Sequence, residues 1–72
     1  MSKKMTDYEI FDLVNGRNLV GKVAAFDGKS ALKQFRLFHA MSPDYQFIIT
    51  EGIWHMVSAY GSNFEAVPVK ED

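Results

Sequence analysis

Apolar positions in this chain repeat with two periods, and the change between them predicts the order of the elements. Two segments near the start, Tyr8–Val14 and Leu19–Phe26, are rich in aromatic and branched residues and flank the pair Asn15-Gly16. Such a pair is the strongest short signal for a β-hairpin, because a type I′ turn needs positive φ at both central positions. We therefore expect these segments to pair as antiparallel strands.

Alternation along this hairpin makes both of its faces substantially apolar. A two-residue turn would place Glu9 opposite Lys22 and Phe11 opposite Val20, whereas a four-residue loop would change the partners but not the residues that share a face. One face would carry Tyr8, Ile10, Asp12, Leu19, Gly21, Val23 and Ala25. The other face would carry Glu9, Phe11, Leu13, Val20, Lys22, Ala24 and Phe26.

Apolar residues spaced three and four apart then predict a single amphipathic helix from Gly28 to Met41. Asp27 is the expected N-cap, with Ser30 as the alternative, and the helix should stop at Ser42-Pro43-Asp44. The arc that should face the sheet carries Ala31, Leu32, Phe35, Phe38 and His39. The opposite side of the helix carries Lys29, Lys33 and Arg36.

A second hairpin is expected from Tyr45–Thr50 and Ile53–Tyr60 around the pair Glu51-Gly52. Its better core face would carry Phe47, Ile49, Trp54, Met56 and Tyr60, and its other face Gln46, Ile48, Thr50, Ile53, His55 and Val57. The tail from Phe64 to Val69 is compatible with a fifth strand, which Pro68 would restrict to an edge or to a strand end.

These elements predict one α+β domain over residues 1–72, in the order β-β-α-β-β with or without a last strand. The sheet would be antiparallel or mixed, with one helix on one face in a two-layer arrangement. Residues 1–6 and 70–72 are expected to be flexible ends. Since one helix shields only one face of a sheet, the apolar residues of the second face need another cover.

Composition narrows the classes of function. The 72 residues are 47% hydrophobic and include no cysteine, which excludes disulfides and thiolate metal sites. A net charge of -1 creates no overall field that would attract nucleic acid or an anionic membrane. No apolar run approaches the roughly 20 residues of a membrane span, and the start lacks a signal-peptide core, so we expect a cytoplasmic protein.

The residue types that carry chemistry do not converge in this pattern. His39 and His55 are the only histidines, and Glu51 and His55 point to opposite sheet faces, which leaves a metal ion short of the three ligands that it needs. No serine stands in a nucleophile elbow, and neither Asn15-Gly16 nor Asp27-Gly28 has the glycine spacing of a phosphate loop. We therefore expect no catalytic, cofactor or metal site, and no enzyme.

The second sheet face is the leading candidate for function. Its apolar residues would bury against a protein, with Phe11, Val20 and Phe26 as the main contacts and Ile48, Ile53 and Val57 as further ones. Glu9, Lys22 and His55 would form a polar rim. Three covers stay open: a second copy, which would make the chain a homo-oligomer, a foreign protein, or the tail 61–69 folded over the face.

A different class of function rests on the basic side of the helix. Lys29, Lys33 and Arg36 could contact the phosphates of single-stranded nucleic acid, and aromatic residues of the sheet could stack on its bases. Against this, the helix and the stacking face would lie on opposite sides of the sheet. We therefore keep nucleic-acid binding as the alternative to protein binding.

The segments Tyr8-Glu-Ile-Phe, Gly21-Lys-Val-Ala-Ala-Phe-Asp and Ser30-Ala-Leu-Lys-Gln-Phe carry a resemblance to known families. Over residues 8–41 the chain is similar to the ββα opening of the small B subunit of phenylacetyl-CoA monooxygenase, and to short proteins of the DpnD/PcfM type carried by mobile elements. The resemblance implies a non-catalytic accessory or interaction protein of bacterial or phage origin. The second half departs from both families, and no functional residue carries over.

Overall fold

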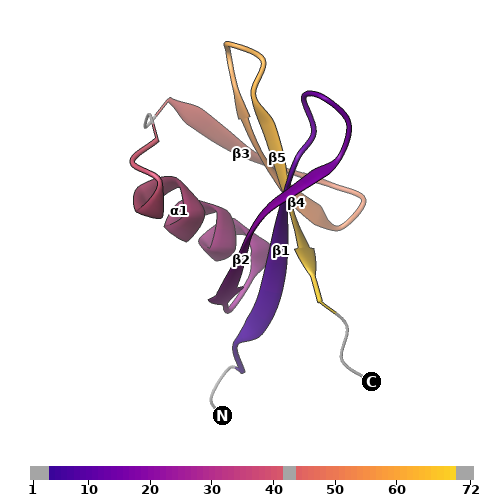
Figure 1. Cartoon of the computed structure of the whole chain (residues 1–72). Coiled ribbons are helices and arrows are strands. Elements are labelled where there is room, and N and C mark those ends of the chain that lie inside the picture. The colour runs from indigo at the N-terminus through magenta and orange to yellow at the C-terminus, as the bar shows by residue number, and fades with distance from the viewer. Residues whose placement is uncertain (1–3, 42–43, 70–72) are drawn as a thin grey trace.

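Five antiparallel strands and one helix form two layers in the computed structural model, which describes residues 4–41 and 44–69 (Figure 1). The elements are β1 (Thr6–Asp12), β2 (Asn18–Ala25), α1 (Gly28–Phe38), β3 (Tyr45–Thr50), β4 (Ile53–Ser58) and β5 (Asn63–Pro68). The strand order is β2-β1-β5-β4-β3. The α+β prediction is confirmed, and of the two sheet types the antiparallel one is present.

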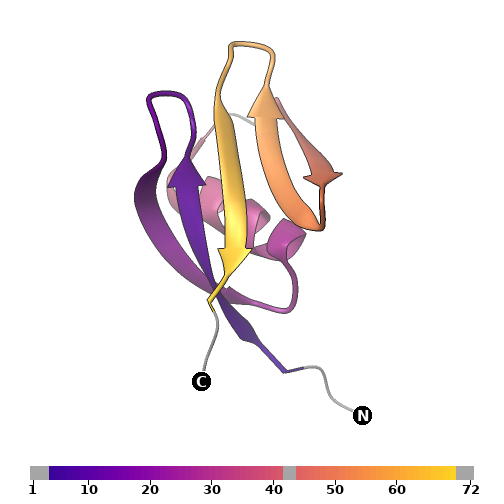
Figure 2. The ribbon, with the colours of Figure 1, turned by 90° about the vertical axis from the view of Figure 1, so that its right-hand side faces the viewer.

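The C-terminal segment forms the middle strand of this sheet. β5 pairs with β1 on one side and with β4 on the other, and Figure 2 shows it between the two hairpins with α1 behind the sheet. Pro68 is the last residue of β5, where a missing backbone donor is tolerated, so the strand-end alternative was the right one. The proposal that residues 61–69 cover the second face is wrong, because they build the sheet instead.

A β-bulge changes the register of the first hairpin. The two-residue register holds as far as Ile10 and includes the expected pair of Glu9 and Lys22. The register then shifts by one residue, so that Phe11 lies opposite Leu19 and not opposite Val20. A bulge puts two residues of one strand opposite one of its partner, which breaks the strict alternation of faces. The prediction that the face sets survive any register is therefore wrong beyond the bulge.

The conformations of the two hairpin turns show why the sequence did not predict the bulge. In the first hairpin only Gly16 has positive φ, and residues 13–17 form a longer loop held by a bond from the Val14 N–H to Asp12 Oδ1 (3.0 Å). Glu51 and Gly52 both have positive φ (52° and 81°), as a type I′ turn requires. The second hairpin therefore has the two-residue turn that the Asn15-Gly16 pair predicted for the first hairpin.

The ends of α1 follow from local hydrogen bonds. Asp27 is the N-cap, and its side chain accepts a bond from the Ser30 N–H at 2.7 Å. At the other end the N–H groups of Ala40 and Met41 donate to the oxygens of Leu37 and Arg36, and Ala40 has φ 51°, which is a Schellman motif. The helix therefore ends at Phe38, earlier than predicted. Ser42 and Pro43 lie outside the described residues.

The core lies between α1 and the centre of the sheet. Its buried residues are Ile10, Ala25, Ala31, Leu32, Phe35, Met56 and Ala66. Phe47 and Trp54 pack on it from the sheet, as the face pattern of β3 and β4 predicts, and Phe64 of β5 packs beside them. Four residues expected to face the core are exposed instead: Phe38 (87%) in the last turn of α1, His39 at its C-cap, Ile49 (55%) on the edge strand β3, and Tyr60 (89%) in the turn after β4.

We predict that Asp27→Ala lowers the free energy of unfolding by about 1 kcal/mol, because the first turn of α1 loses its side-chain acceptor. Ser30→Ala is the matched control and should change stability little. Urea unfolding followed by circular dichroism measures both. Equal effects of the two variants would contradict the assignment of Asp27 as the cap.

We also predict that Ala40→Gly raises the free energy of unfolding by about 1 kcal/mol, since glycine adopts the left-handed conformation at C′ without steric strain. In the same urea assay Ala24→Gly, at an exposed position of β2 with ordinary φ, should destabilise by about 0.5–1 kcal/mol. A loss of stability in Ala40→Gly would show that the C-terminal motif is described wrongly.

Candidate functional site

The sheet face away from α1 is uncovered, but it is less apolar than the sequence pattern suggests. β5 contributes Glu65 to its centre, opposite Phe11 on one side and His55 on the other. Arg17, from the first loop, lies over Phe11, with its guanidinium carbon 3.8 Å from the ring centroid. A polar row therefore crosses the middle of this face.

Hydrogen bonds order that row. The Nε of Arg17 donates to Glu65 Oε2 at 2.7 Å, and His55 Nε2 lies 3.5 Å from Glu65 Oε1. His55 Nδ1 lies 3.1 Å from the backbone oxygen of Ile53, so each ring nitrogen of His55 faces an oxygen. The side chains of His55 and Glu65 are only 15% and 14% exposed. His55 is thus a central residue of the face and not part of a rim.

The six predicted partner-binding residues do not form one surface. Ile48, Ile53 and Val57 lie on the β3–β4 half of the open face, and Phe11 lies on the other half under Arg17. Val20 belongs to the bulge, and Phe26 follows the end of β2. The patch that alternation predicts across all five strands is therefore divided.

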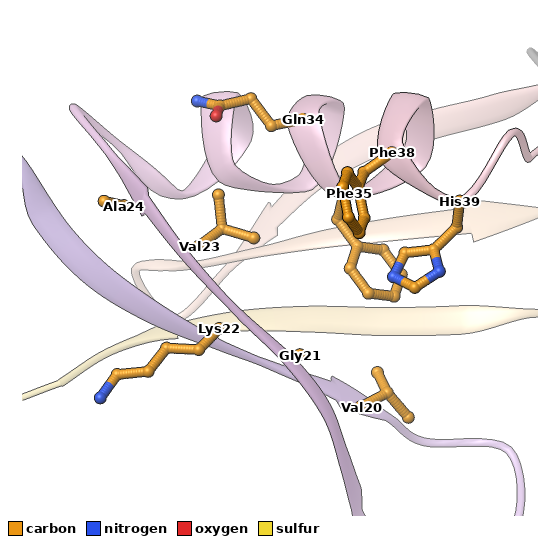
Figure 3. A pocket seen from close by; sticks show the side chains of 9 residues that line it. All are labelled: Val20, Gly21, Lys22, Val23, Ala24, Gln34, Phe35, Phe38 and His39. Carbon is orange, nitrogen blue, oxygen red and sulfur yellow. The ribbon is translucent and has the colours of Figure 1, made fainter.

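Val20 instead helps to line a groove between β2 and α1. The groove has a volume of about 650 Å³ and is lined by Val20, Gly21, Lys22, Val23, Ala24, Gln34, Phe35, Phe38 and His39. Figure 3 shows Val20 and Val23 pointing from β2 toward the helix, with Lys22 pointing away. β2 is an edge strand, so one side of its backbone has no partner strand among the described residues.

Gly21 allows this groove to form. A Cβ atom on Gly21 would lie 3.0 Å from Cε1 of Phe35, so the ring of Phe35 occupies the space of a side chain on β2. His39 packs beside Phe35, with ring centroids 4.4 Å apart, as Figure 3 shows. Phe38 stands in the last turn of α1 and exposes nearly all of its ring. The wall and floor of the groove are thus mainly apolar.

The basic residues of α1 lie closer to the sheet than expected. The cationic groups of Lys29, Lys33 and Arg36 are 6.0, 5.8 and 5.9 Å from the ring centroid of Phe47 on β3. Lys29 also lies 5.5 Å from the ring of Trp54. Of the aromatic residues expected to stack on bases, which were Phe11, Phe26, Tyr45 and Trp54, Trp54 therefore lies on the same side as the helix and not opposite to it. We call these three cations with Phe47 the basic cluster.

Groups with chemical reactivity are sparse in the structure. Within residues 4–41 and 44–69, no three histidine, aspartate or glutamate side chains lie close enough to hold a metal ion. Ser58 has a structural contact, since its Oγ accepts from the N–H groups of Tyr60 and Ser62 at 3.2 Å each. No helix in the described part of the chain is long and apolar enough to cross a bilayer.

Sequence reasoning missed the exposure of Phe38 and the polar row. The helical period places Phe38 on the buried arc, but in the last turn of α1 this residue is 87% exposed. Arg17 and Glu65 stand far apart in the sequence and meet because β5 pairs with β1. The chain matches no protein-family model, and no curated protein or solved structure is significantly similar to it.

Proposed function

We propose that this chain is a non-catalytic protein-interaction module that binds its partner in the groove between β2 and α1. The observation that carries this proposal is the exposed ring of Phe38 beside an apolar groove. A partner can place an apolar side chain in this groove, against the ring, without pairing with the backbone of β2. The implied role of an accessory protein, from the resemblance of residues 8–41, agrees with this proposal.

The energy available at Phe38 is large for one residue. Burying most of a phenylalanine that exposes 87% of its surface contributes about 2–3 kcal/mol gross. Aromatic residues in a fully desolvated pocket are typical interface hot spots. The open sheet face offers less, because its centre is the polar row of Arg17, Glu65 and His55.

The partner is either a second copy of this chain or a foreign protein, and both would use apolar burial. Single-stranded nucleic acid is the alternative of a different class, through Lys29, Lys33 and Arg36. In the structure these three cations all lie about 6 Å from the ring of Phe47. This proximity favours nucleic-acid binding more strongly than the sequence pattern alone. However, Phe47 and Trp54 are half-buried beside the cations and offer little free ring surface for base stacking. We therefore retain protein binding as the function.

We predict that Phe38→Ser weakens protein binding at least tenfold while the free energy of unfolding changes by less than about 0.5 kcal/mol, since the ring is exposed in the free chain. Peptides selected from a random display library on the full chain supply the ligand, and fluorescence anisotropy measures their affinity. Light scattering at high micromolar concentration tests a second copy as the ligand.

Two exposed residues elsewhere are the controls for this experiment. Tyr60→Ser removes an equally exposed ring from a distant turn, and Ile48→Ser removes an exposed apolar side chain from the open face. Neither should change the affinity of the selected peptides. Loss of binding in Ile48→Ser but not in Phe38→Ser would move the interface to the open face. A chain that stays monomeric and selects no peptide would overturn the proposal.

A further inference from the structure

The two edges of the sheet differ in how they are protected against pairing. β2 carries a bulge and an exposed lysine, Lys22, which are two features that natural sheets use to block an edge. β3, at the other edge, has the sequence YQFIIT, with no charge, no proline and an uninterrupted register with β4. Such an edge is a template for another strand.

α1 leaves this second edge open. The helix packs mainly on β2, β5 and β4, and four of the six residues of β3 are exposed. Ile48 (44% exposed) lies on the face away from α1, and Ile49 (55% exposed) on the face toward it. A strand added here would therefore gain apolar contacts on both of its faces.

The basic cluster lies on the α1 side of the β3 edge. Lys29 and Lys33 approach Phe47 of β3 within about 6 Å of the ring centroid. No carboxylate forms an ion pair with either lysine among the described residues. In a chain with a net charge of -1, this is a concentrated positive site that a partner's carboxylates can neutralise.

We propose that β3 is a docking edge for an extended acidic segment of another protein, which adds to the sheet as a further strand. Its side chains on the α1 side are acidic and meet Lys29 and Lys33, and those on the open side are β-branched or aromatic and meet Ile48. This inference goes beyond the proposed function, because it assigns a second surface on the opposite edge of the sheet.

Charge decides which occupant fits the edge. If a second copy paired through its own β3, side chains of like faces would meet, and two basic clusters would lie together on the α1 side. A single-stranded nucleic acid would satisfy the cations but not the backbone N–H and C=O groups of the β3 edge. An acidic extended peptide satisfies the cations, the backbone and the exposed Ile48 together.

The test uses the full chain and a short synthetic peptide in which glutamate alternates with valine. We expect the peptide to bind, and backbone amides of β3 to exchange hydrogen more slowly in the complex. Lys33→Glu should weaken binding about tenfold, because it replaces an attraction by a repulsion. Lys22→Glu makes the same charge change on the β2 edge and should leave the affinity unchanged.

Two further ligands separate strand addition from simple charge attraction. The same peptide, with an N-methyl group on every backbone nitrogen, keeps its charge but cannot complete a ladder, and it should not bind. Equal binding of this peptide would overturn the proposal, as would an oligothymidylate that binds and displaces the unmodified peptide. A dimer of the free chain that protects β3 amides would also overturn it. None of these outcomes depends on the groove at Phe38.

Discussion

The structure depends on one helix having to cover five strands. An α-helix is about 10 Å wide, whereas five strands spaced about 4.8 Å apart span roughly 19 Å between the outer two. α1 packs mainly on β2, β5 and β4, and Leu32 and Phe35 meet Ile10 and Met56 in the core. The outer strand β3 therefore extends beyond the helix, and the basic cluster lies there. At the other edge the apolar groove lies between α1 and β2.

The central position of β5 determines what the uncovered face looks like. Each hairpin pairs one strand with β5, so the last segment of the chain joins two halves that make no other sheet contact. A strand buried between neighbours usually presents apolar residues to the helix side, as Phe64 and Ala66 do. Glu65, which stands between these two residues in β5, then faces outward and contacts Arg17 and His55. The polar row is thus a consequence of topology.

The sequence predicts the elements well because each has a local cause. The caps and periods of α1, and the tight turn at Glu51 and Gly52, are determined within a few residues of chain. Features that no local pattern marks were missed: the register shift between β1 and β2, and the pairing of β5 that brings Glu65 beside Arg17 and His55. The candidate surfaces inherit these errors. Of the six expected contacts, only Val20 lines the groove.

The asymmetry of the two edges is itself informative, because an unprotected edge strand is a hazard for a soluble chain. β2 has both a bulge and Lys22, which shows that this chain contains features that discourage pairing at one edge. Such features are absent within β3, although Asp44 and Glu51 flank the strand, and Lys29 and Lys33 of α1 approach its Phe47 from the helix side. Cations in that position repel a second β3 but attract a carboxylate. The arrangement therefore disfavours self-pairing while it leaves the edge open to an acidic strand, which is the selectivity that a specific docking edge requires.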